Sequence, residues 1–234
     1  MQLISIIIPV YNHWPELKQA LRSIQAQTQR PLEVIIVDDG SQAPIAGQID
    51  AREFGLEIKL HRQANQGAAA ARNAGFAISR GEFVIFWDAD VIAMPAMLQK
   101  MHNVLTLHPE ASYVYSDFFY GKKKMPAQKF DARDLRKKNY IMTTSLVRRD
   151  NFAAFDEKLK RFQDWDLWLT LSARGQNGIY IPEFLFTVTP RKNGISFWLP
   201  GFAYKKPWSW LPGIRRKVRE FNKAKKIIAD KHRL

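Results

Sequence analysis

Hydrophobic positions in the first ninety residues predict strands and helices in alternation. The run from Leu3 to Val10 is continuously apolar, as expected of a strand that is covered on both faces of a parallel sheet. Apolar residues then recur at helical spacing from Leu17 to Ile24, after Pro15, which is typical of a first helical turn. Further strands are predicted over residues 33–37, 56–60 and 82–87, and a helix of small side chains over residues 68–79.

The pattern continues less regularly beyond residue 90. Helices are predicted over residues 95–107 and 164–174, and strands over residues 113–115 and 179–188. Pro182 indicates an edge or a bend in the last of these strands. Because strand and helix alternate four times in the first part, we expect an α/β fold with a mainly parallel sheet, right-handed crossovers and flanking helices.

Four carboxylates follow directly after predicted strands. Asp38 and Asp39 end one strand, and Asp88 and Asp90 follow another. The carboxyl ends of parallel strands meet at one edge of an open sheet, and ligands bind outside that edge. The sequence therefore predicts an acidic cleft built from two separate strands.

The composition excludes several classes of site. The chain has 234 residues, of which 46% are hydrophobic and 25% charged, a balance typical of a folded domain. It contains no cysteine, so disulfides, thiolate nucleophiles and zinc–thiolate sites are excluded, and a metal would need oxygen or histidine ligands. No segment resembles a secretion signal or a membrane span, and we expect a cytoplasmic protein.

The net charge of +14 is concentrated near the end of the sequence. Residues 190–234 hold 13 Lys and Arg against 2 Asp and Glu, and residues 122–138 form a second basic island with 8 against 2. We divide the chain into a domain over residues 1–189 and a basic, Trp-rich extension over residues 190–234. Polyanionic partners are expected at these basic surfaces.

The Asp-x-Asp of residues 88–90 suits a divalent metal. Mg2+ and Mn2+ prefer carboxylate oxygens, and Mg2+ is usually held by one or two carboxylates together with substrate phosphates. Asp38 or Asp39 would then be available to accept a hydrogen bond from a base or a ribose hydroxyl. A solvated acidic turn is the competing interpretation.

Five segments together resemble family 2 glycosyltransferases, which are GT-A fold enzymes that use nucleotide sugars. They are SIIIPVYN (5–12), EVIIVDDGS (33–41), NQGAAAARNAG (65–75), GEFVIFWDAD (81–90) and FDEKLKRFQDWDLWL (155–169). The match covers about residues 3–170, in the family's order and spacing. It implies transfer of a sugar from a UDP-sugar to a hydroxyl acceptor, with inversion and with Mn2+ or Mg2+ as cofactor.

The resemblance also assigns roles to individual residues. Nucleotide contacts are implied for Pro9, Val10, Tyr11, Asp39, Arg72 and Asp88, and metal binding for Asp90 and Asp88. Asp164 matches the family's catalytic base, while Gln163 stands where the family has a glutamate. The position after the Asp-x-Asp, where many members carry a further acid, is Val91.

Two of these positions have a second interpretation. A carboxylate such as Asp164 can act as general base beside an acceptor hydroxyl, but an aspartate at the start of a helix is also a favoured N-cap. Trp165 could stack on an acceptor sugar in the acceptor site or cover the core. The sequence leaves both choices open.

The activity and the acceptor also have alternatives. The resemblance implies an acceptor that is a cell-surface or lipid-linked glycan, as in polysaccharide biosynthesis. A polyprenyl-phosphate sugar transferase would use the same nucleotide site, and an inactive nucleotide-sugar or glycan-binding module would bind without transfer. The sugar, the linkage and the oligomeric state are left open.

Residues 214–228 predict a basic amphipathic helix. Ile214, Val218 and Phe221 share one face, and basic residues crowd the others. We expect this helix to dock the protein peripherally on the anionic inner face of a membrane, with packing onto the domain as the alternative. No nucleic-acid partner is expected, because no DNA- or RNA-binding motif accompanies the charge.

Overall fold

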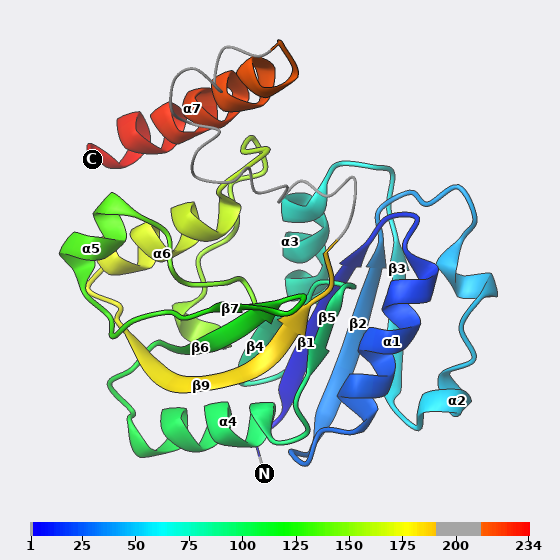
Figure 1. Cartoon of the computed structure of the whole chain (residues 1–234). Coiled ribbons are helices and arrows are strands. Elements are labelled where there is room, and N and C mark those ends of the chain that lie inside the picture. Colours follow the sequence, from blue (N-terminus) through cyan, green and yellow to red (C-terminus); the bar gives the residue numbers. More distant parts are fainter. Residues whose placement is uncertain (1, 191–211) are drawn as a thin grey trace.

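A computed structural model describes residues 2–190 and 212–234 of the chain. The first part contains β1 (Ile4–Val10), α1 (Trp14–Gln25), β2 (Leu32–Asp38), α2 (Ala51–Phe54), β3 (Glu57–Arg62), α3 (Ala68–Ile78) and β4 (Phe83–Phe86). The second part contains β5 (Val91–Ala93), α4 (Met97–Leu107), β6 (Tyr113–Tyr120), β7 (Lys123–Met125), α5 (Ala132–Lys137), β8 (Leu146–Arg148), α6 (Gln163–Ala173), β9 (Gly178–Val188) and α7 (Pro212–His232). Within the described residues the strands form one nine-stranded sheet in the order β3-β2-β1-β4-β8-β6-β9-β5, with β7 paired to β6 (Figure 1).

The first half of the sheet is parallel, as predicted. Strands β3, β2, β1 and β4 run in one direction, with β2 on one side of β1 and β4 on the other. Helices α1 and α4 cover one face and α3, α5 and α6 the other (Figure 1). A Cβ added at Gly75 would lie 2.5 Å from a methyl carbon of Ile7, so the small side chains of α3 do let this helix pack directly on β1.

The second half of the sheet is mixed. Strand β8 is antiparallel to β4 and β6, β9 is parallel to β6, and β5 is antiparallel to β9. The prediction of a mainly parallel sheet therefore holds for the first half only. Strands β5, β7 and β8 have three residues each, which is too short for a period-2 pattern to reveal them. Pro182 lies where the β6–β9 register is interrupted, so it marks a bend inside the sheet.

Helix α7 is the helix predicted in the basic extension, and its last turns pack on the domain. Ile228 is 0% exposed and belongs to the same core cluster as α6. The ring of Phe221 makes an edge-on contact with Phe162, with 5.2 Å between the ring centroids. The structure therefore shows this part of the helix packed onto the domain, which was the predicted alternative to membrane docking. The three tryptophans of the extension lie outside the described residues.

Candidate active site

The predicted acidic residues lie at one edge of the parallel half of the sheet. Asp38 ends β2 beside Val10 at the end of β1. On the other side of β1, the N–H of Trp87 continues the pairing of β4 by donating to the carbonyl of Ile7, and Asp88 follows. The edge between β1 and β4 is where the strand order reverses, which is the usual ligand position in open α/β sheets. The topology thus places the two acidic segments at the same edge of the sheet, on either side of β1.

The two aspartates after β2 have different surroundings. Oxygen atoms of Asp38 accept hydrogen bonds from the backbone N–H groups of Ser41 and Ile45, at 2.9 and 3.2 Å. Burial alone would raise the pKa of Asp38, but these hydrogen bonds and the nearby Arg62 guanidinium outweigh it and lower the pKa. Asp38 therefore acts as a structural residue that closes the turn after β2.

Asp39 is the aspartate that faces the loop before α3. Its Oδ1 accepts from the side chain of Gln63 and from the N–H of Gln66, both at 2.9 Å, and its Oδ2 accepts from the N–H of Gly67 at 2.8 Å. Gly67 has a φ of 93°, a conformation that favours glycine. An ionised carboxylate has about four acceptor positions, so these contacts occupy three of them and fix the orientation of the Asp39 side chain.

The three residues predicted at the end of β1 occupy different environments. Tyr11 is 43% exposed, and Pro9 is partly buried. Val10 is buried in the core, and its carbonyl accepts a 2.9 Å hydrogen bond from the N–H of Asp39. Tyr11 therefore has a ring available to a ligand, whereas Val10 contributes the backbone that fixes Asp39.

Arg72 joins the Asp-x-Asp to the start of α6. Arg72 is 7% exposed, and its guanidinium donates to Oδ1 of Asp88 at 2.6 Å and to Oε1 of Gln163 at 3.0 Å. Gln163 in turn donates to the carbonyl of Leu159 at 2.7 Å. Gln163, which stands where the family has a glutamate, thus binds Arg72 without adding a negative charge. Among the described residues, the buried Nε of Arg72 has no hydrogen-bond partner.

Asp164 lies in the first turn of α6 and is not its N-cap. Helix α6 begins at Gln163, and the N-cap position is Phe162, with a φ of 60° and no side-chain cap hydrogen bond. Burial raises the pKa of Asp164 above its ordinary value, although the N–H of Trp165, the side chain of Asn139 and the charge of Arg72 each act to lower it. A carboxylate with a raised pKa is suited to accept a proton.

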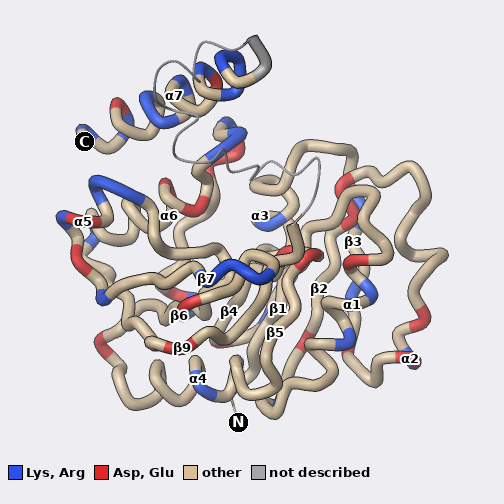
Figure 2. The backbone as a smooth tube through the Cα atoms, viewed as in Figure 1, with Lys and Arg blue, Asp and Glu red and all other residues tan. Residues whose placement is uncertain are grey.

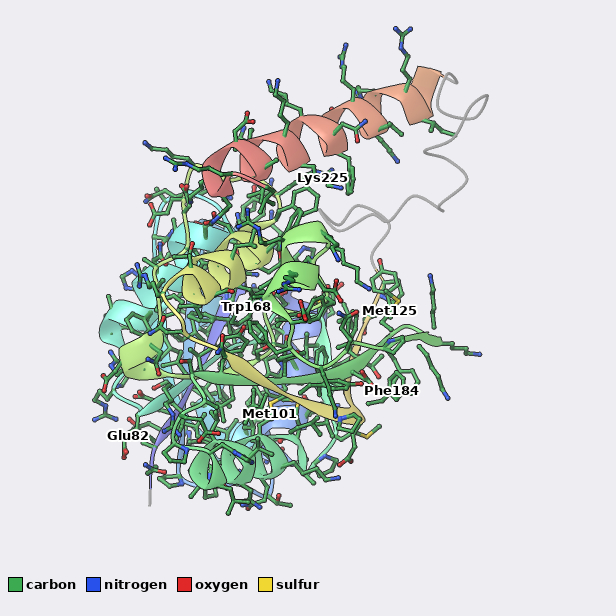
Figure 3. The ribbon with its side chains drawn as sticks, turned by 90° about the vertical axis from the view of Figure 1, so that its left-hand side faces the viewer. Glu82, Met101, Met125, Trp168, Phe184 and Lys225 are labelled. Carbon is green, nitrogen blue, oxygen red and sulfur yellow. The ribbon has the colours of Figure 1, made fainter. Side chains whose placement is uncertain are left out.

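The tryptophans that follow Asp164 belong to the core. Trp165 is 2% exposed, and its indole N–H donates to the carbonyl of Leu135 at 2.7 Å. The indole of Trp168 lies beneath α6, toward the sheet (Figure 3), and donates to the carbonyl of Ile141 at 3.0 Å. The position of Trp165 does not support contact with an acceptor sugar, because its ring is covered. Both tryptophans instead fix the segment around α5 against α6.

The carboxylates of the Asp-x-Asp are candidate metal ligands. Asp90 lines a pocket together with Pro15, Glu16, Gln19, Ile92 and Thr189. Asp88 keeps one oxygen outside its contact with Arg72. Among the described residues no group of three His, Asp or Glu side chains could hold a metal by itself. This donor set fits an ion such as Mg2+ or Mn2+ that takes its remaining ligands from substrate phosphates and water.

Comparison with known proteins gives the same family. A family model described as Glycosyl transferase family 2 matches residues 5–161. The glycosyltransferase YwdF of Bacillus subtilis is 30% identical over 179 residues, which cover 71% of this chain and 66% of YwdF. A glycosyltransferase of Haemophilus influenzae is 28% identical over 183 residues, which cover 72% of this chain and 62% of that protein. The chain thus spans slightly less than two thirds of the length of these relatives.

Two solved structures share the fold. TarS 1–349 of S. aureus in complex with UDP-GlcNAc has a TM-score of 0.71 at 20% identity, covering 86% of this chain and 62% of TarS 1–349. The mannosyltransferase PcManGT of Pyrobaculum calidifontis, in complex with GDP-Man and Mn2+, has a TM-score of 0.63 at 20% identity. The match covers 82% of this chain and 58% of PcManGT. The α/β sheet with flanking helices is therefore the GT-A type of architecture that the resemblance predicts.

Proposed function

Because the chain belongs to glycosyl transferase family 2, we propose that it transfers one sugar from a UDP-sugar to a hydroxyl group of a glycan or lipid-linked glycan, with inversion. One observation carries this proposal: Arg72 connects Asp88 of the Asp-x-Asp to Gln163, the neighbour of Asp164. A candidate donor site and a candidate base therefore belong to one connected cluster. Such a cluster is what direct displacement requires.

The chain's own residues divide the work of donor binding. Asp39 would accept a hydrogen bond from a base N–H, and the exposed ring of Tyr11, which follows Val10 at the end of β1, would contact the nucleotide. Asp90, with Asp88, would hold Mn2+ or Mg2+, which when bound neutralises charge on the diphosphate leaving group. Complexes of structurally similar proteins with UDP-GlcNAc and with GDP-Man and Mn2+ support a nucleotide-sugar donor and a divalent metal.

Asp164 performs the proton transfer in this mechanism. The ionised carboxylate removes the proton of the acceptor hydroxyl as its oxygen forms a bond to the anomeric carbon. The bond between that carbon and the diphosphate oxygen breaks, and UDP leaves with the electron pair. Attack opposite the leaving group inverts the anomeric centre, and no covalent enzyme intermediate is needed.

The first prediction concerns donor binding. UDP with Mn2+ should raise the thermal midpoint of the full chain, because a ligand that binds only the folded state stabilises it, by about 2.7 kcal/mol at a hundredfold excess over Kd. Asp90→Asn should lose the part of this shift that depends on Mn2+. A thermal-shift series with UDP, UDP-GlcNAc, UDP-glucose and GDP, each with and without Mn2+, measures both effects. Equal shifts with GDP would contradict the UDP assignment, and no shift with any nucleotide would contradict the function.

We also propose that α7 docks the protein peripherally on an anionic membrane at the cytoplasmic inner face. No described helix is long and apolar enough to cross a bilayer. The apolar face of α7 is engaged by the domain at Ile228 and Phe221, so the contact with lipid is electrostatic. Figure 2 shows Lys and Arg positions spread along α7, and Figure 3 shows nitrogen-tipped side chains of this helix pointing away from the domain. The exposed ones include Arg215, Arg216, Arg219, Lys223 and Lys226.

The second prediction tests this docking with the intact chain. Vesicles that contain anionic phosphatidylserine should pellet the protein at low salt, since each Lys or Arg near such a surface contributes about 1 kcal/mol. Binding should fall steeply as salt is raised, and neutral phosphatidylcholine vesicles serve as the control. Reversing three charges, R215E/R219E/K223E, should abolish pelleting. Unchanged pelleting of this variant, or equal binding to neutral vesicles, would contradict the proposal.

A further inference from the structure

The candidate base is held by a residue that no sequence motif indicates. Asn139 lies between α5 and β8, and its side-chain N–H donates a 2.7 Å hydrogen bond to Oδ2 of Asp164. The other end of the amide accepts a hydrogen bond from the N–H of Ile141 at 3.2 Å. With both ends of the amide engaged, its orientation is fixed. We propose that Asn139 is a positioning residue that orients the Asp164 carboxylate for proton transfer from the acceptor hydroxyl.

The segment that carries Asn139 is itself fixed to α6. Trp168 donates its indole N–H to the carbonyl of Ile141, two residues beyond Asn139, and Ile141 is buried. Trp165 makes the corresponding contact with Leu135 in α5. The two tryptophans therefore brace the backbone on either side of Asn139 against the helix that carries Asp164. A catalytic group needs this kind of support, because a displacement of about 1 Å can cost a hundredfold in rate.

The hydrogen bond has a chemical effect as well as a geometric one. Donation from Asn139 favours the ionised form of Asp164 and so opposes the effect of burial on its pKa. The positive charge of Arg72, on α3, also lowers the pKa of Asp164. Because the base must be ionised to work, loss of the Asn139 hydrogen bond should weaken the enzyme most at acidic pH.

The third prediction follows, and it rests on the proposed role of Asp164. We expect Asn139→Ala to lower kcat about tenfold at neutral pH and to move the acidic limb of the kcat/KM profile upward by about one pH unit. Asn139→Asp, which places a like charge beside Asp164, should move that limb further. KM for the donor should stay within about twofold, because Asn139 lies outside the proposed nucleotide contacts. The deficit should shrink as the pH rises.

The measurement is release of UDP from UDP-GlcNAc or UDP-glucose in the presence of Mn2+, with water or an added glycan as acceptor. Asn103→Ala is a matched control, since Asn103 is an exposed asparagine on α4 that pairs with Gln99. The thermal midpoint and the UDP-induced shift of each variant separate a folding defect from a catalytic one.

Two results would overturn the inference. One is a kcat/KM profile whose acidic limb lies at the same pH in Asn139→Ala and in the unaltered chain. The other is a loss of rate that is fully explained by a smaller fraction of folded protein. Comparison with Asp164→Asn distinguishes the two proposals. If Asp164→Asn abolishes transfer while Asn139→Ala leaves the acidic limb in place, only the positioning role fails. If Asp164→Asn transfers sugar at the normal rate, Asp164 is not the base, and both the base assignment and the positioning role of Asn139 are wrong.

Discussion

Replacing Asp164 by Asn should reduce sugar transfer to a hydroxyl acceptor by about 100- to 10,000-fold, the range that a positioned general base contributes. An amide in this position has the same size but cannot accept the proton of the hydroxyl. UDP and Mn2+ should still raise the thermal midpoint of the variant, because the contacts of Asp39, Asp88 and Asp90 are unchanged. The measurement is initial rate with a UDP-sugar and candidate glycan acceptors at saturating donor.

The same substitution separates the two enzymatic alternatives. Transfer to a polyprenyl phosphate would use an acceptor oxygen that is already ionised and needs no strong base, so Asp164→Asn would retain most of its activity with that acceptor. Retained transfer to a hydroxyl would contradict the assignment of Asp164 as base. If the unaltered chain binds UDP with Mn2+ but neither transfers sugar nor hydrolyses the donor, the inactive binding module is the correct alternative.

The parts of the fold that the sequence predicts are those with strong local patterns. The continuous apolar runs of β1 and β2 reflect burial on both faces of the sheet, and the small side chains of α3 reflect its close packing on β1. The predicted bounds of these three elements agree with the structure to within one or two residues. Helix α5 was not predicted, although Asp131 caps it by accepting from the N–H groups of Arg133 and Asp134. Six residues provide less than two helical turns, which is too few for a periodic pattern to identify.

The candidate site was predictable where a motif follows a strand, and not where the contacts join distant segments. The positions of Asp39 and Asp88 follow from the ends of β2 and β4. The contact between Arg72 and Gln163 spans 91 positions of the chain, and Asn139 reaches Asp164 from a segment without regular structure. No periodic or local signal specifies such pairs, since they depend on how α5 and α6 pack on the sheet.

The residue two positions after the candidate base connects the domain to its extension. The side chain of Asp166 is 4% exposed, and its carboxylate contacts Lys231 at 2.8 Å and His232 at 2.7 Å, both from the last turn of α7. Lys231 also contacts Asp156 at 2.8 Å. These contacts, together with buried Ile228, make the end of α7 part of the folded domain. A truncation that removes α7 therefore alters the domain and is unsuitable as a test of membrane docking.

The double variant Lys231→Ala/His232→Ala should lower the free energy of unfolding by about 2–3 kcal/mol. Removing one side of a buried ion pair costs roughly 3–5 kcal/mol, and the partial exposure of Lys231 reduces that value. For a chain of this size the thermal midpoint should fall by about 5–10 °C. Differential scanning calorimetry measures the loss, with Lys226→Ala, an exposed lysine on the same helix, as the control.

Asp166→Asn provides the reciprocal test of this ion-pair cluster. This change removes the buried negative charge, while Lys231 is partly exposed and keeps its contact with Asp156, so the loss of stability should be smaller than in the double variant. If the cost comes from leaving Asp166 buried and unpaired, adding Asp166→Asn to the double variant should restore part of the lost stability. A triple variant no more stable than the double variant would show that the cluster acts through packing, and a double variant with an unchanged midpoint would show that α7 is not held by these residues.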